Sequence, residues 1–313
     1  MQSLPSQARR LNREASRQSL VLLQNRRGVL PLKRPRPPAT AAKPVVVIGP
    51  SANSSRLLGG GHYARQILPS DGFPSVPGAI RALLGPRATV RWEPGIRCSA
   101  RSDSVCVDPQ PDAALRQAAV SQARGASQVV LLLGLQSREP CDSDAAYSRA
   151  GGEFNPCGYE SEQHDRGSTA LPKLQQELAL AVLAATKAAG VPCVVVLVHG
   201  GALAIEAIKA AADGILDAHY PGEATGAQAV AQALYGVFSP GGKLSYSVMP
   251  AAFTGLSDFT SFSMSEPPGR TYWYYPTSPA SMPPVLWPFG WGLTYSHFNI
   301  SLADPARPYS FLY

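Results

Sequence analysis

The sequence predicts an α/β fold, in which a mostly parallel β-sheet carries helices on both of its faces. Short Val- and Leu-rich runs lack the alternation of a half-exposed strand, and segments with helical periodicity separate them. Such runs are typical of strands buried on both faces, and repeated strand, helix, strand units favour a parallel sheet. The chain has 313 residues, 45% of them hydrophobic, which suffices for a sizeable core.

The expected elements follow one another in a regular order. An amphipathic helix is expected near the N-terminus, in "SQARRLNREASRQSLVLLQN". Strands are expected at 44–49, 88–92, 128–134, 193–198 and 214–219. Helices are expected at 76–84, 112–124, 172–189, 203–212 and 222–235. In such sheets the loops that leave the carboxyl ends of the strands form the binding crevice.

Charge and hydropathy argue against two classes of partner. Much of the formal charge of +7 comes from basic residues near the N-terminus, without interleaved aromatic residues for base stacking. We therefore expect a solvated or partner-facing helix and no nucleic acid. No apolar run approaches the roughly 20 residues that span a bilayer, so no membrane partner is expected. The first residues also lack the pattern of a signal peptide.

The cysteines and two N-glycosylation sequons indicate the cellular compartment of the protein. Two local disulfides are expected, and they would join Cys98 to Cys106 and Cys141 to Cys157. Cys193 would then remain as a buried free thiol, because it lies in an apolar run. Asn53 and Asn299 begin N-glycosylation acceptor patterns. Both features favour a secreted or secretory-pathway protein, extracellular or lysosomal.

The glycine-rich and histidine-containing stretches match no nucleotide, esterase or metal signature. "LLGGGH" at 57–62 lacks the G-x-G-x-x-G spacing of a dinucleotide fold. "HGGA" at 199–202 resembles an esterase oxyanion loop, but the chain has no G-x-S-x-G nucleophile motif. No short metal-ligand spacing joins the histidines, which are His62, His164, His199, His219 and His297. We therefore expect no metal and no cofactor.

Charge is most concentrated in "GYESEQHDRGSTALP", residues 158–172. Five ionisable residues fall within seven positions there, namely Glu160, Glu162, His164, Asp165 and Arg166. They belong to a segment without evident secondary structure, 135–171, that follows an expected strand. Loops of this length inside a compact domain are usually functional or disordered, and a disulfide within it favours order. A solvated surface loop is the alternative.

Seven stretches, taken in order, resemble one protein family. They are "REASRQSLVLLQNRRGVLPL" (13–32), "VVVIGPSANSSRLLGG" (45–60), "YESEQHDRGSTALPKLQQEL" (159–178), "VVVLVHGGALAI" (194–205), "HYPGEATGAQAVAQALYGVFSPGGKL" (219–244), "PGRTYWYY" (268–275) and "PFGWGLTYSHF" (288–298). Together they are similar to the C-terminal α/β sandwich domain of glycoside hydrolase family 3, and most of all to its β-xylosidase-like members.

The resemblance implies a fold, a domain division and an activity. The fold is a six-stranded sheet, and the implied partner is the family's N-terminal (β/α)8 barrel, which this sequence does not contain. A linker helix and lead-in segment would occupy 1–43, the sandwich 44–250, and a C-terminal extension 251–313, packed on the sandwich or on the barrel. The implied activity is retaining hydrolysis of β-linked xylosides or related glycosides.

In the family, the acidic loop supplies the acid/base carboxyl group and the barrel supplies the nucleophilic aspartate. The gapless match of "YESEQHDR" places Glu160 at the acid/base position. An insertion shortly before this stretch departs from the family pattern, so Glu139, near the end of a strand, and Glu162 remain alternatives. Asp165 and Arg166 are expected to form a local ion pair that anchors the loop.

A second hypothesis belongs to another functional class. The chain would be a non-catalytic carbohydrate-binding or interaction module derived from the enzyme, as the insertion and the absent barrel suggest. Several aromatic side chains would be able to stack on a sugar, namely Tyr272, Trp287, Phe289 and Trp291. Core or interdomain packing is the more common role of such residues.

Overall fold

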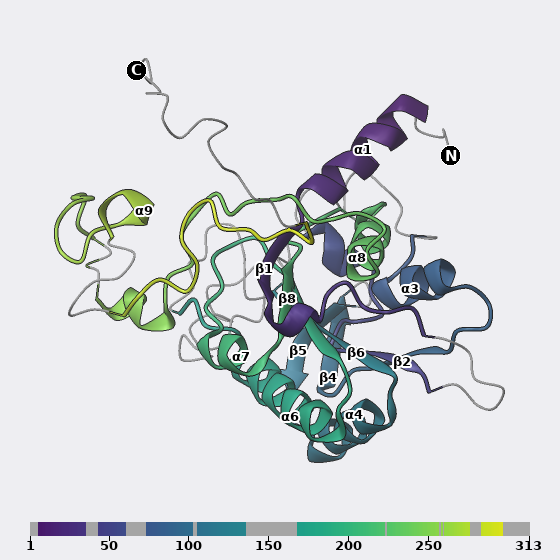
Figure 1. The fold of residues 1–313 in the computed structure, drawn as a ribbon. Coiled ribbons are helices and arrows are strands. Elements are labelled where there is room, and N and C mark those ends of the chain that lie inside the picture. Colours follow the sequence, from purple (N-terminus) through teal and green to yellow (C-terminus); the bar gives the residue numbers. More distant parts are fainter. Residues whose placement is uncertain are drawn as a thin grey trace, which may run out of the picture.

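The computed structural model confirms the predicted α/β fold, with a six-stranded, mostly parallel sheet between layers of helices (Figure 1). The structure describes residues 6–35, 43–60, 73–102, 105–135, 168–222, 224–256, 258, 260–275 and 283–296. Within these residues, no helix combines the length and the apolar character needed to cross a membrane.

The sheet has the strand order β1-β8-β7-β6-β2-β3. Its strands are β1 (Val21–Asn25), β2 (Val45–Ile48), β3 (Val90–Glu93), β6 (Gln128–Gly134), β7 (Cys193–Val198) and β8 (Gly214–Asp217). The last five are the predicted apolar runs, and they pair in parallel. β1 forms an edge of the sheet and pairs antiparallel to β8, with Val21 opposite Asp217.

Strand β6 shows why the apolar runs lack alternation. Successive side chains of a strand point to opposite faces of the sheet. In β6, Val129, Leu131 and Leu133 belong to one hydrophobic core, whereas Val130 and Leu132 belong to the core on the other face. All five side chains are at most 1% exposed. Each buried Val or Leu contributes about 1.5–3 kcal/mol, so the same strand stabilises both helical layers.

The helices form two layers on the sheet (Figure 1). One contains α4 (Ala113–Gly125), α6 (Lys173–Ala189) and α7 (Glu206–Ala211), and the other contains α3 (Val76–Leu84), α8 (Gly226–Leu234) and the adjacent α1 (Ser6–Gln18). Short helical turns lie at η1 (Arg26–Gly28), η2 (Arg56–Gly59), η3 (Ala251–Gly255) and α9 (Thr271–Tyr274).

Helices α7 and α8 begin three to four residues later than predicted. Ala204 forms a β-bridge with Ala170, which keeps the residues before α7 extended. Gly222 has a φ of +91°, a left-handed conformation that cannot belong to a right-handed helix. Local pairing and turn geometry therefore override helical periodicity at both sites.

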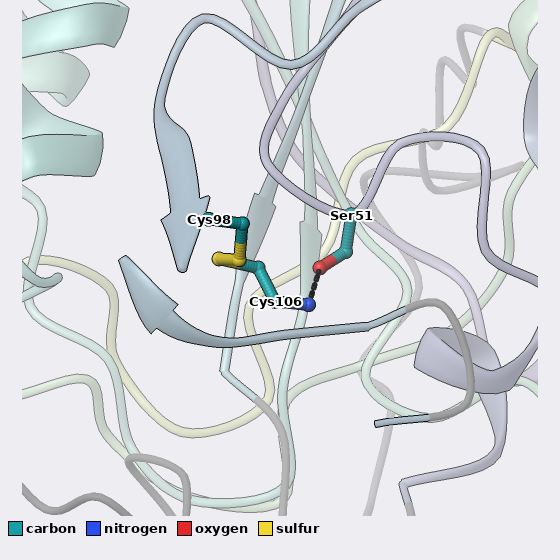
Figure 2. The surroundings of a disulfide bond; sticks show 3 residues. All are labelled: Ser51, Cys98 and Cys106. Carbon is teal, nitrogen blue, oxygen red and sulfur yellow. Dashed lines mark hydrogen bonds between the residues drawn. A yellow bond between two sulfur atoms is a disulfide. The ribbon is translucent and has the colours of Figure 1, made fainter. Parts of the chain in front are cut away.

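A second sheet was not predicted. It consists of two polar antiparallel strands, β4 (Arg97–Ser102) and β5 (Val105–Gln110). Figure 2 shows the disulfide that joins Cys98 to Cys106, whose Cα atoms are 5.6 Å apart. The amide of Cys106 donates a hydrogen bond to Oγ of Ser51, at 2.9 Å, in the loop after β2. This small sheet is therefore attached to the carboxyl edge of the large one.

The described part of the C-terminal segment packs back on the sandwich. β-bridges join Val248 to Trp287 and Leu22 to Leu293. Trp287 is only 3% exposed and belongs to a hydrophobic core, and Nζ of Lys209 lies 4.7 Å from its ring centre. Trp287 is thus a core residue, in agreement with the packing role expected for the aromatic residues.

Cys193, the first residue of β7, provides a test of this packing. It is a free thiol, 8% exposed, and burial raises its pKa to about 12. Such a thiol is ionised to only about one part in 10,000 at pH 8, against roughly a quarter for an ordinary thiol, and only the thiolate reacts. We expect iodoacetamide at pH 8 to label Cys193 only after denaturant is added, as measured by peptide mass spectrometry. Equal labelling rates in the native and denatured chain would contradict the prediction.

Candidate functional site

The predicted acid/base loop leaves and rejoins the described structure at the carboxyl edge of the sheet. Its predicted residues lie in 136–167, outside the described residues, and these are Glu139, Glu160, Glu162, Asp165, Arg166, Cys141 and Cys157. On one flank, the amide of Leu135 donates to the carbonyl of Val198, at the end of β7, at 2.8 Å. On the other flank, Ala170 bridges to Ala204, in the loop after β7. Both flanks therefore lie beside the end of β7.

Gln175 of α6 holds the end of β6. Its Nε2 donates to the carbonyl of Gly134 at 2.8 Å, and its Oε1 accepts from the amide of Gly134 at 3.0 Å. Gly134 has a φ of +149°, and a Cβ there would lie 1.8 Å from the carbonyl oxygen of Val198. The Gln175 side chain, which is only 6% exposed, and the close contact between Gly134 and the Val198 backbone therefore fix the point where the segment leaves the sheet.

Three ionisable side chains meet at the ends of β7 and β8. His199 directly follows β7, Asp217 ends β8, and His219 lies two residues further along. Leu197 pairs with Asp217, and His199 is two residues beyond Leu197, so alternation puts His199 and Asp217 on one face. Oδ1 of Asp217 lies 3.1 Å from Nε2 of His199 and 3.2 Å from Nδ1 of His219.

Further contacts orient both imidazole rings. His219 has a left-handed φ of 48°, and its amide donates to Oδ1 of Asp217 at 3.0 Å. The outer nitrogen of each ring also has a partner. Nδ1 of His199 lies 2.6 Å from the carbonyl oxygen of Gly201, and Nε2 of His219 lies 3.2 Å from the hydroxyl of Tyr246. The orientation of each ring is therefore fixed at both nitrogens.

Burial disfavours the charged form of Asp217 unless nearby groups stabilise it. The side chains of His199 and Asp217 are each 2% exposed, and that of His219 is 27% exposed. Burial alone would raise the pKa of Asp217. The charge and hydrogen bond of His199, together with the charge and backbone amide of His219, outweigh burial and lower that pKa. A carboxylate that stays ionised in the interior requires positive charge beside it.

The cluster was not predicted, because histidine spacing along the chain gives no sign of it. The signal lay in strand position. His199 directly follows one predicted strand, and Asp217 and His219 lie at the end of another. Parallel strands bring their carboxyl ends to the same edge, so polar residues at these two ends become candidates to meet.

The other predicted residues that the structure describes make different contacts. Asn53 is exposed, and its side chain accepts a hydrogen bond from Oγ of Ser75 at 3.0 Å. Asn299 lies outside the described residues. Tyr272 and Phe289 stack with ring centres 4.0 Å apart, and each is 46% exposed. They form an exposed aromatic pair, in contrast to the buried Trp287.

Comparison with known proteins decides the family. The model of the glycosyl hydrolase family 3 C-terminal domain matches residues 20–295. The chain belongs to this family. The match covers the six-stranded sheet, both helical layers from α3 onward, and the segment that carries the predicted acid/base residues.

Relatives of this family 3 chain are longer proteins. A probable exo-1,4-beta-xylosidase, xlnD, of Aspergillus japonicus is 30% identical over 303 residues, which cover 94% of this chain and 32% of that protein. A periplasmic beta-glucosidase of Salmonella typhimurium is 28% identical over 312 residues, covering 95% and 36%. A solved beta-glucosidase structure from Erythrobacter marinus has a TM-score of 0.66 at 27% identity, covering 95% and 36%. The chain thus spans about a third of the length of these relatives.

The role of Gln175 can be measured directly. Gln175→Ala should lower the free energy of unfolding by about 1–3 kcal/mol, because it removes the side-chain partner of two partly buried backbone groups of Gly134. Hydrogen exchange at the Gly134 amide should accelerate as well. Gln18→Ala is the matched control, since Gln18 is exposed and bonds only to Glu14 among the described side-chain contacts; we expect a change below about 0.5 kcal/mol there. Equal effects of the two substitutions in denaturant titrations would refute this role.

Proposed function

We propose that this chain is the C-terminal domain of a retaining β-glycosidase acting on β-linked xylosides or related glycosides. In this proposal, segment 136–167 supplies the acid/base carboxyl group. The observation that carries it is the position of both flanks of this carboxylate-rich segment at the carboxyl edge, where α/β sheets bind ligands. Family membership and the names of the relatives, xylosidases and glucosidases, support it.

The chemistry explains why such a site would use two domains. A retaining glycosidase needs two carboxyl groups about 5–5.5 Å apart, one ionised and one protonated. The ionised group attacks the anomeric carbon while the protonated group gives its proton to the departing oxygen. Water then breaks the glycosyl-enzyme bond, and the second group accepts the proton of that water. We assign the nucleophile to an aspartate of a (β/α)8 barrel, since separate domains can give the two groups different pKa values.

Glu160 is the favoured acid/base residue, and Glu139 and Glu162 are the alternatives. The alignment of "YESEQHDR" with the family pattern supports Glu160. Glu139 competes because it lies only a few residues beyond the end of β6, which Gln175 holds in place. Asp165 and Arg166 would anchor the loop as an ion pair and take no part in proton transfer.

We also propose that the protein is secreted or passes through the secretory pathway. The disulfide between Cys98 and Cys106 supports an oxidising compartment. The exposed position of Asn53 makes its sequon accessible to glycosylation. The periplasmic location in the name of one relative agrees with this proposal.

The 313-residue chain alone should be nearly inactive. Double displacement requires the nucleophile, which the proposal assigns to the barrel. Hydrolysis of an aryl β-xyloside by the isolated chain, compared with a full-length relative at equal concentration, measures this. Turnover by the chain alone at the rate of the relative would overturn the two-domain assignment.

In a full-length protein, Glu160→Gln should slow xylosides with poor leaving groups most. These substrates depend on protonation of the departing oxygen, whereas activated aryl glycosides need less help in the first step. Azide should rescue the second step, because it attacks the glycosyl-enzyme without a general base. Rates against leaving-group pKa, with and without azide, provide the measurement.

Glu139→Gln and Glu162→Gln are the matched controls for this experiment. If the leaving-group dependence and azide rescue occur in Glu139→Gln instead, the acid/base role moves to Glu139. If none of the three substitutions affects unactivated xylosides, the assignment of the acid/base role to these glutamates is overturned and the non-catalytic alternative is favoured.

A further inference from the structure

We propose that His199, Asp217 and His219 form a binding site for a divalent transition-metal ion, best matched by Zn²⁺. The site lies at the ends of β7 and β8, and no part of the proposed glycosidase chemistry uses it. Each residue offers one ligand atom, and these atoms all lie within 4.8 Å of one another. Two imidazoles and one carboxylate are a ligand set typical of zinc, whereas magnesium and calcium prefer oxygen ligands.

The tautomer of His199 is the first argument. Its Nδ1 lies 2.6 Å from the carbonyl oxygen of Gly201. A carbonyl oxygen only accepts hydrogen bonds, so Nδ1 carries the hydrogen. In the neutral ring, Nε2 then presents its lone pair to Oδ1 of Asp217, 3.1 Å away. Two lone pairs at this distance repel each other unless a proton or a metal ion lies with them.

His219 also has one ring nitrogen toward Asp217 and the other toward a hydrogen-bond acceptor, but here Nδ1 faces Asp217 and Nε2 faces the acceptor. Its Nε2 lies 3.2 Å from the Tyr246 hydroxyl, which can accept a hydrogen bond. Its Nδ1 lies 3.2 Å from the same Oδ1 of Asp217. Metal-binding histidines usually donate their other ring N–H to a carbonyl, a carboxylate or water. A carbonyl occupies that position for His199, and a hydroxyl occupies it for His219.

The spacing of the inner atoms fits a tetrahedral ion. Zinc bonds of about 2.0–2.1 Å to nitrogen and about 2.0–2.2 Å to oxygen place neighbouring ligand atoms about 3.4 Å apart in tetrahedral geometry. The two nitrogen–oxygen distances in the cluster are 3.1 and 3.2 Å. A small outward movement of the side chains would therefore accommodate the ion.

The burial and the backbone geometry of the three residues are consistent with metal binding. His199 and Asp217 are nearly inaccessible, whereas the His219 side chain is 27% exposed and gives an ion access from that side. Three protein ligands leave a fourth position for water, as in many zinc sites with three protein ligands. His219 has a left-handed φ of 48°, and its amide donates to Oδ1 of Asp217. Non-glycine residues adopt this conformation infrequently, and it occurs often at functional sites.

The metal-free alternative is a protonated His199 that forms a buried ion pair with Asp217. Both arrangements satisfy the same contacts, but only the metal site predicts saturable binding of one ion per chain. The probe is ZnCl₂, titrated calorimetrically into the chelator-treated 313-residue chain. CoCl₂ is the spectroscopic probe, because tetrahedral Co²⁺ with nitrogen and oxygen ligands absorbs strongly in the visible region.

We expect one Zn²⁺ per chain and a Co²⁺ spectrum without thiolate charge-transfer bands, which excludes binding at cysteines. His199→Ala, Asp217→Asn and His219→Asn should each weaken Zn²⁺ binding at least about 100-fold, since each removes a ligand. Asparagine suits position 219 because it tolerates a left-handed backbone. Tyr246→Phe should weaken binding about 10–100-fold by removing only the outer partner of His219.

His297→Ala is the matched control, because it removes a histidine other than the two proposed ligands. It should leave Zn²⁺ affinity unchanged. Absence of saturable Zn²⁺ binding in the unsubstituted chain would overturn the proposal, and so would equal affinity in that chain, His219→Asn and Tyr246→Phe. The Tyr246 and His219 substitutions keep the test decisive even if His199→Ala or Asp217→Asn does not fold.

Discussion

Helices cover both faces of the sheet, so polar chemistry has to gather where the strands end. The buried polar side chains of the parallel strands follow this constraint. Gln128, at the start of β6, bonds to the carbonyl of Lys33 and the hydroxyl of Tyr235. Asp217, at the end of β8, meets two histidines instead. The buried polar side chain at the amino end of β6 is therefore a neutral amide, whereas the one at the carboxyl end of β8 is a carboxyl group beside two histidines.

The same constraint explains which features the sequence could predict. Four of the five predicted strands, β2, β6, β7 and β8, were identified because two-sided burial leaves a continuous apolar run, whereas the edge strand β3 is partly exposed. β4 and β5 were missed because a disulfide and a contact with Ser51 stabilise them, and neither leaves a hydrophobic pattern. The histidine cluster depends on the register that sets Asp217 opposite Leu197, which no local pattern encodes. The acid/base residues came from family resemblance, since spacing alone does not distinguish Glu160 from Glu139 or Glu162.

The loop anchor and the histidine cluster share one stretch of backbone. Val198 accepts the hydrogen bond from Leu135, and the next residue along the chain is His199. Displacement of His199 would therefore move the carbonyl that holds the start of the acidic segment. The proposed cation site and the proposed acid/base loop are therefore neighbours along the backbone, although the two proposals rest on different observations.

The antiparallel direction of β1 has a geometric consequence for a two-domain enzyme. Because Val21 lies opposite Asp217, β1 begins at the carboxyl end of β8, the same side of the sheet from which the proposed acid/base segment leaves. A domain attached ahead of α1 would be tethered on the side where its own reactive carboxylate is needed. A short linker between that domain and α1 would then suffice. The effective concentration of the proposed nucleophile near the proposed acid/base segment would be high. A parallel β1 would have put the tether at the opposite edge, a full strand length away.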